Sequence, residues 1–438
     1  MYSNPIGFIK FVEGKISYSF LFIIILVCQC IAQQKDSLAG HLTVNAEIRP
    51  RAEYASNYML PQNESIDSYL YITQRNRISA SYSREKWMLK ADFQETHLWD
   101  RNSETGKTAG LNFYQLFFET RFKSFSLRVG RQSVLLDNGR LFSDAPWAQQ
   151  GRTHEGIRLM QHSKNLSNDL FFLFTRSYND SFEPAYSPVA SNKYKYLAIY
   201  NANYSFNERL SVTSLNSVDL LEKPDSGTLH ARATAGGRID FKNKNWFCTL
   251  NSYLQFGQNP KEQKLAAYYF QPEIKWTYGK YNLRLGAEII SGSSPGTADN
   301  RSSDFDVLYG VTWKFNGNMN VFTRFPADVG GKGLVNPYHF SQLQINPKLS
   351  IRNDFHLFYS QYHPSGALNH EMSRFLGYEN DLSLKYMPIK QLEINCAFSF
   401  YQPTGSMINL PKIKDTDQTV FWSYLMVSYS FKAIDFKG

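Results

Sequence analysis

The sequence predicts an all-β chain that forms a single large antiparallel transmembrane β-barrel. Apolar and polar residues alternate with a period of two along most of the chain, which is typical of strands with one apolar face. Short turns alternate with longer polar loops, and aromatic residues, 16% of the chain, gather near the ends of the predicted strands. The longest apolar run, Phe20–Val27, is shorter than the roughly 18 residues that a membrane-spanning helix needs.

The first 32 residues have the composition of a secretory signal peptide. Lys10 and Lys15 precede the apolar run, and Cys30 and Ala32 supply small residues for a cleavage site. A membrane anchor or a lipidated cysteine is the less favoured alternative. We therefore predict a cleaved signal peptide at 1–32 and a barrel domain at 33–438, with a net charge of +8 after cleavage.

Three segments show the strand pattern clearly, namely His41–Tyr54, Trp87–Trp99 and Thr419–Phe431. Strands of about 10–13 residues suit a tilted crossing of the bilayer, whereas strands of β-sandwiches average about 5–6 residues. A β-propeller would show a repeat of about 40–50 residues, and the sequence has none. Our own count gives 18–20 strands, with an even number expected.

Two of the predicted connections illustrate the alternation, because the turn Phe122–Phe125 is short and the loop Asp137–Gly151 is long. In outer-membrane barrels the short turns are periplasmic and the long loops extracellular. The signal peptide, the alternation and an aromatic final strand ending at Phe431 together predict the bacterial outer membrane. The expected partners are outer-membrane lipid and, through that final strand, the barrel-assembly machinery. Cys248 and Cys396 are expected to lie singly on strand faces.

Charged residues on the polar strand faces should point into the lumen. A ring of arginine or lysine makes a pore favour anions, and the guanidinium fork matches carboxylates. Alternatively, interior pairs of arginine with glutamate or aspartate brace the wall, and both interpretations stay open for any single residue. The predicted pore-lining residues from the alternation are Glu47, Arg49, Arg75, Arg77, Asp92, Glu119, Arg128, Arg352, Asp354, Glu379, Asp381 and Lys385.

Several ordered segments resemble the alginate-export family of outer-membrane porins. The resemblance implies a monomeric barrel of eighteen strands with an arginine-rich constriction, through which an anionic polyuronate passes. The segments are Gln74–Ile78, Leu127–Gln132, Asp137–Leu141, Trp147–Leu159, Asp306–Gly310, Gly330–Leu334, His356–Phe358 and Phe375–Leu382.

By position, the family's arginine pattern falls on Arg75, Arg77, Arg131 and Arg152, with Arg158 just beyond it. We therefore add Arg131, Arg152, Arg158 and the neighbouring Glu155 to the predicted substrate path. The alternation alone puts Arg131 on the outer face, so its place in the path requires a bulge.

Other chemistry has little support in the sequence. The nine histidines form no metal-binding motif, and Gly330–Gly333 lacks the spacing of a phosphate-binding loop. We expect no cofactor, no metal, no nucleic-acid partner and no enzymatic activity. The prediction is an outer-membrane channel for anionic solutes, with export of a polyuronate such as alginate as one candidate role. A barrel enzyme acting on lipid or peptide, and a structural or adhesive barrel, are the alternatives. The substrate and the direction of transport stay open.

Overall fold

The computed structural model describes residues 40–57, 68–99, 110–175, 194–223, 226–364, 372–408, 410, 413 and 415–437. The predicted signal peptide at 1–32 lies outside the described residues. In the described ranges, no helix is long and apolar enough to span a membrane.

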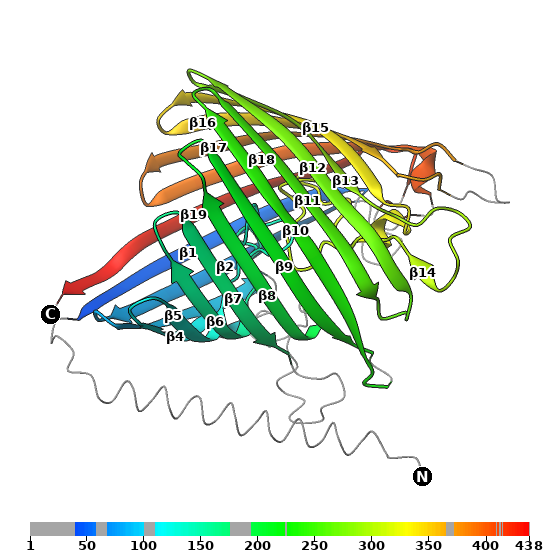
Figure 1. Cartoon of the computed structure of the whole chain (residues 1–438). Coiled ribbons are helices and arrows are strands. Elements are labelled where there is room, and N and C mark those ends of the chain that lie inside the picture. The colour runs from blue at the N-terminus through cyan, green and yellow to red at the C-terminus, as the bar shows by residue number, and fades with distance from the viewer. Residues whose placement is uncertain are drawn as a thin grey trace, which may run out of the picture.

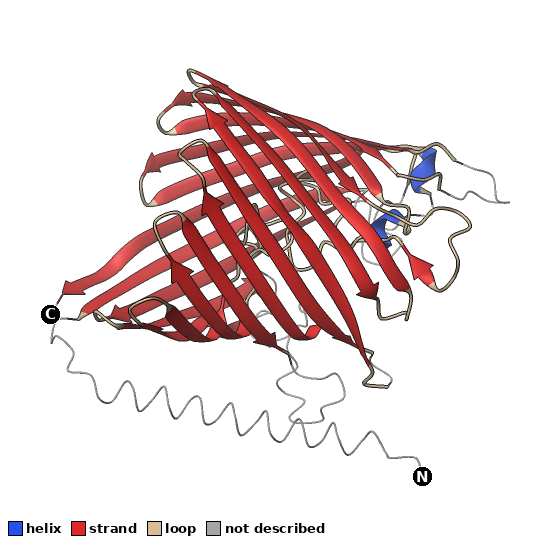
Figure 2. Cartoon of the chain, in the orientation of Figure 1, coloured by secondary structure: helices blue, strands red, loops and turns tan. Residues whose placement is uncertain are grey.

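Eighteen strands form one closed antiparallel wall, and a further two-residue strand, β14 (Arg301–Ser302), pairs with β12 in parallel. This confirms the predicted fold class (Figure 2). The wall strands are β1 (His41–Ser56), β2 (Ser68–Ser83), β3 (Trp87–Leu98), β4 (Gly110–Arg121), β5 (Ser126–Gln132), β6 (His154–His162), β7 (Leu166–Phe174), β8 (Tyr194–Ser205), β9 (Leu210–Glu222), β10 (Leu229–Asn243), β11 (Trp246–Gln258), β12 (Lys264–Tyr278), β13 (Tyr281–Ile290), β15 (Leu334–Asn346), β16 (Leu349–Tyr359), β17 (Phe375–Ile389), β18 (Leu392–Pro403) and β19 (Val420–Lys437).

The barrel closes where β1 pairs with β19, and the two strands lie side by side in Figure 1. The predicted end of the final strand at Phe431 is wrong, because β19 continues to Lys437, which pairs with His41. The register shifts at this point, since Val44 faces Ile434 while its neighbour Asn45 faces Lys432. A β-bulge of this kind inserts one residue and breaks the alternation on which the prediction depends.

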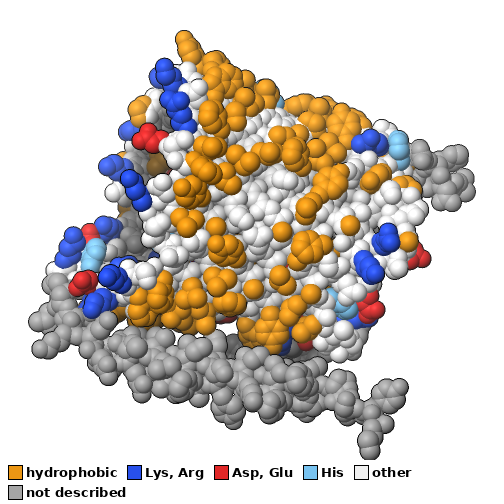
Figure 3. All heavy atoms as spheres, in the orientation of Figure 1, with side chains coloured by type: hydrophobic (Ala, Val, Ile, Leu, Met, Phe, Trp, Pro, Cys, Tyr) orange, Lys and Arg blue, Asp and Glu red, His pale blue; other side chains and the backbone are white. Residues whose placement is uncertain are grey.

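The outer face of the wall is apolar and the inner face is polar, as the alternation predicts. Apolar side chains gather over the face of the wall shown in Figure 3. Ile78, Phe93 and Leu254 are among the large apolar residues that are exposed. Aromatic residues such as Phe122 and Trp246 are exposed next to the short turns, which suits an interfacial girdle. Cys248 and Cys396 are both free, on β11 and β18.

Two long connections fold into the lumen. Residues 133–153 join β5 to β6, and residues 303–333 join β14 to β15; their apolar side chains are buried together against the inner wall. Loop segments can be seen inside the barrel in Figure 2. Asp137–Gly151 therefore lies inside the barrel rather than outside it. The buried apolar core fills the half of the lumen near the long loops.

Candidate functional site

The two infolded connections are bonded to each other across the lumen. Phe142 and Tyr309 form an isolated parallel bridge, with the Tyr309 amide donating to the Leu141 carbonyl at 2.9 Å. Gly310 is required here, because a Cβ at that position would collide with the carbonyl of Arg140. Arg152 donates to the carbonyl oxygens of Tyr309 and Gly310, and burial lowers the pKa of its guanidinium. The connections thus act as one packed unit.

Three of the inward arginines hold the first infolded connection by its backbone. Arg49 donates to the carbonyl oxygens of Pro146 at 2.8 Å and Ala148 at 2.7 Å. The guanidinium of Arg51 donates to the Trp147 carbonyl and lies 3.9 Å from the Trp147 ring centroid. Arg75 reaches the Ala148 carbonyl at 3.3 Å and also pairs with Glu47 at 2.5 Å. Their donors are therefore directed at protein atoms.

Most other predicted pore-lining charges also face inward and are paired. Arg128 pairs with Glu119, and Arg158 pairs with Asp169. Asp92 accepts from Gln115 and pairs with Lys90, while Arg77 donates to Gln94 and stacks over Tyr114. The observed arrangement is the bracing alternative that the sequence left open.

Glu379 and Asp381 also face inward and are almost fully buried. Their carboxylates accept from backbone amides of the second infolded connection, Glu379 from Met319 and Asp381 from Asn318. They therefore anchor that connection to β17.

Arg131 and Glu155 do not line the pore, so their predicted place in the substrate path is wrong. They pair with each other at 2.5 Å, with 39% and 50% of their side chains exposed. Their strand neighbours across the ladder are Leu116 and Phe174, which are exposed on the outer wall. The bulge needed to turn Arg131 inward is absent from β5, whose pairing with β4 is regular from Leu116 to Arg121.

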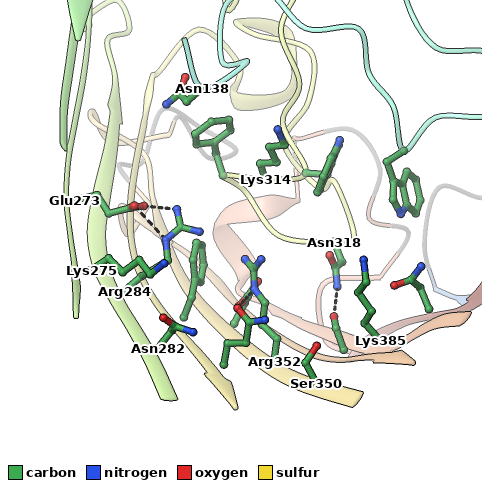
Figure 4. Close-up of a pocket in the computed structure, with 18 of the residues that line it drawn as sticks. Asn138, Glu273, Lys275, Asn282, Arg284, Lys314, Asn318, Ser350, Arg352 and Lys385 are labelled. Atoms are coloured by element: carbon green, nitrogen blue, oxygen red, sulfur yellow. Dashed lines mark hydrogen bonds and ion pairs between the residues drawn. The ribbon is translucent and has the colours of Figure 1, made fainter. Parts of the chain in front are cut away.

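A water-accessible cavity of about 820 Å³ remains in the half of the lumen near the short turns. We call this cavity the vestibule. Its wall comes from β10 to β13 and β15 to β19, and its roof from the infolded connections (Figure 4). Its charged lining residues are Arg238, Glu273, Lys275, Arg284, Lys314, Arg352, Asp354, Lys385 and Glu393.

Positive charge exceeds negative charge in the vestibule lining, with six cations and three carboxylates. Each carboxylate is paired, Glu273 with Arg284, Asp354 with Arg352 and Glu393 with Lys385, all at 2.6 Å. Among the described residues, no ion pair involves Lys275 or Lys314. Lys314 extends from the infolded connection above the wall residues in Figure 4.

Arg352, Asp354 and Lys385 are predicted from the sequence, whereas the other vestibule charges are not. Arg238 and Lys275 lie on polar strand faces, so the alternation could have identified them. Lys314 lies in a connection whose path no strand pattern describes. In the described residues, no group of three histidine, cysteine, aspartate or glutamate residues could hold a metal ion.

The closed barrel and its partly filled lumen define an outer-membrane β-barrel channel of the porin class. The sequence model described as alginate export matches residues 41–361, and the chain belongs to this family. No curated protein matches the chain.

Solved structures share the fold at low sequence identity. The outer membrane protein OpdK from Pseudomonas aeruginosa has a TM-score of 0.62 and 12% identity, covering 89% of this chain and 98% of OpdK. OpdL from the same organism has a TM-score of 0.62 and 13% identity, covering 90% and 99%. OccK2 (OpdF) from the same organism, solved in complex with glucuronate, has a TM-score of 0.58 and 12% identity, covering 90% and 98%.

Proposed function

We propose that this outer-membrane channel passes anionic solutes, with a polyuronate such as alginate as one candidate. The excess of cations in the vestibule carries the proposal, and Lys275 and Lys314 are its central residues. A conducting site must bind its solute well enough to admit it and weakly enough to release it. Lys275 and Lys314 form no ion pair with any residue that the structure describes, and they lie beside arginines that already hold carboxylates, so they suit that requirement.

The paired arginines of the vestibule have a second role in this proposal. Arg284 and Arg352 each pair with a carboxylate, and this pairing fixes the orientation of their guanidinium groups at the surface of the vestibule. A passing carboxylate can share their remaining donors, because a guanidinium carries five N–H groups. Asn282 and Asn395 add neutral hydrogen-bonding groups to the same surface.

The proposal also covers how the chain reaches the outer membrane, how it assembles and what sets the width of its passage. Residues 1–32 direct the chain to the outer membrane and are removed, and β19 is the strand presented to the barrel-assembly machinery. The barrel acts as a monomer, without a cofactor and without a catalytic step. Arg49, Arg75 and Arg152 set the width of the passage by holding the infolded connections.

Reversal potentials in planar bilayers under a KCl gradient test the proposal. The native channel should prefer chloride, and Lys275→Ala with Lys314→Ala should move the reversal potential towards zero. A matched control, Lys223→Ala with Lys261→Ala, removes two lysines at the opposite end, the half-buried Lys223 and the exposed Lys261, and should leave the potential unchanged. Cation preference in the native channel, or an unaltered potential in the vestibule variant, would contradict the proposal.

A further inference from the structure

The positive charge of the barrel is concentrated at one end. Within the described residues, all eight short turns between wall strands carry at least one lysine or arginine, giving nine cations against Glu85 and Glu208. We call these nine side chains the basic ring. They are Arg84, Lys86, Lys123, Lys164, Arg209, Lys244, Lys280, Lys348 and Lys390.

The rest of the chain does not share this excess. In the sequence, the connections at the opposite end, including the two infolded ones, contain 14 cations and 17 carboxylates. The nineteen strands have a net charge of only +4, because their arginines are largely matched by carboxylates. The basic ring, at +7, therefore accounts for most of the charge that remains after the predicted signal peptide is removed.

Seven of the nine residues of the basic ring are exposed, whereas Arg84 and Lys86 are half-buried. Lys123, Lys164, Lys348 and Lys390 are exposed, and none forms an ion pair with another described residue. Figure 3 shows lysine and arginine side chains projecting from the edge of the wall near the C-terminus. Since short turns mark the periplasmic end of outer-membrane barrels, the ring surrounds the periplasmic mouth.

The basic ring is continuous with the vestibule. Lys242 is on the lumen-facing side of β10 at the edge of the mouth, with its Nζ 6.0 Å from the centroid of the Phe247 ring. Phe247 lines the vestibule. Lys275 on β12 and Lys385 on β17 also line it, and each lies a few residues before a lysine of the basic ring, Lys280 and Lys390 respectively. Cations thus extend from the rim into the cavity, and the carboxylates among them, Asp240 and Glu393, are held by Arg238 and Lys385.

We propose that the basic ring captures polyanionic solute at the periplasmic mouth and delivers it to the vestibule. This inference rests on the proposed function and adds a second, outer site with a preferred side of entry. Like charges around a mouth raise the local concentration of a counter-ion and increase association rates by about 10- to 1,000-fold at low salt. The charge pattern favours a long flexible polyanion, because such a solute can contact several turns at once.

Anionic phospholipid of the inner leaflet is the competing occupant. Arg84 suits that role, because its guanidinium lies 5.9 Å from Trp87 and 6.0 Å from Tyr82, in the interfacial girdle. Continuity with the lumen favours the solute for the ring as a whole.

The test uses the full-length channel and hexagalacturonate as the probe, with uncharged maltohexaose as the control sugar. The ring variant combines Lys244→Gln, Lys280→Gln, Lys348→Gln and Lys390→Gln. A matched variant removes the same charge at the opposite end through Lys223→Gln, Lys261→Gln, Lys264→Gln and Arg301→Gln. For each single channel, the probe is added to one chamber and then to the other, so the ratio of blocking rates does not depend on the direction of insertion.

The native channel should be blocked about tenfold faster from one side at 50 mM salt, with the ratio falling towards one at 1 M salt. In the ring variant, the blocking rates from the two sides should become equal, while the duration of each block stays as in the native channel. In the matched variant, both the ratio of blocking rates and the duration of each block should stay native. Equal rates from the two sides, or equal behaviour of the two variants, would overturn capture while leaving chloride preference intact. If the ring variant keeps the native ratio but loses binding to phosphatidylglycerol vesicles, the ring is a lipid site and the proposal is wrong.

Discussion

Arg140 and Glu288 form an ion pair inside the barrel, with Nε and Oε1 2.5 Å apart and both side chains fully buried. The pair joins the first infolded connection to β13, and Tyr269 donates to the same carboxylate at 2.8 Å. Breaking a buried pair from one side leaves an uncompensated charge and costs about 3–5 kcal/mol. Glu288→Ala should lower the unfolding free energy by that amount in urea titrations followed by tryptophan fluorescence. Lys223→Ala, at an ion pair with Glu262 whose side chains are 38% and 57% exposed, is the control and should change it little.

Arg49 should control the width of the passage. Its fork satisfies carbonyl oxygens of the connection that crosses the lumen, and lysine cannot reproduce this because it lacks the planar geometry. Arg49→Lys should therefore raise single-channel conductance and current noise while the barrel stays folded in gel-shift assays. Arg121→Lys changes a half-exposed arginine at the β4 end and should leave both unchanged. Native conductance in Arg49→Lys would mean that the connection is held without this clamp.

The outer pair Arg131–Glu155 should be dispensable for conduction. Replacing both charges by leucine exchanges an ion pair for apolar area on a wall already bordered by Leu116 and Phe174. Such replacements are often neutral or stabilising by about 1–4 kcal/mol. The double leucine variant should keep native conductance and unfold at equal or higher urea concentration. A change in ion selectivity in this variant would place the pair in the solute path after all.

Gly310 is a sensitive position in the infolded connections. Any side chain there meets the Arg140 carbonyl, so Gly310→Ala must push the two connections apart. In Gly310→Ala, proteases should therefore begin to cleave the infolded connections at a lower temperature than in the native protein. The barrel wall should still resist heating in detergent. Gly405→Ala is the matched control, because a Cβ at Gly405 would have no atom within 4 Å. Equal protease resistance in the two variants would show that the contact relaxes without cost.

The wall of the barrel was predictable because alternation is a local property of the sequence. The same rule placed Arg49, Arg75, Asp92 and Arg352 on inward faces correctly, and it put Arg131 on the outer face, against the family pattern. The position of a side chain on a strand face depends on its neighbours two residues away, so no long-range information is needed.

The lumen was not predictable in the same way. The role of an inward arginine depends on which partner reaches it, and the partners of Arg49 lie about 100 positions further along the chain. Leu136, Leu141 and Phe142 were an available signal, since an outer loop has little reason to carry three apolar residues that become buried. Lys314 could not be found from its sequence, because only the path of the connection brings it over the vestibule.

The pairing of β1 with β19 makes the first wall strand dependent on the last. His41 meets Lys437, so this contact spans almost the whole described chain and ranks among the most non-local contacts of the fold. Until β19 is in place, β1 and β18 each have a free edge. The backbone groups along these edges cannot form hydrogen bonds in hydrocarbon, at a cost of several kcal/mol for each group. A partly made barrel therefore has no stable resting state within the bilayer, and insertion has to coincide with closure.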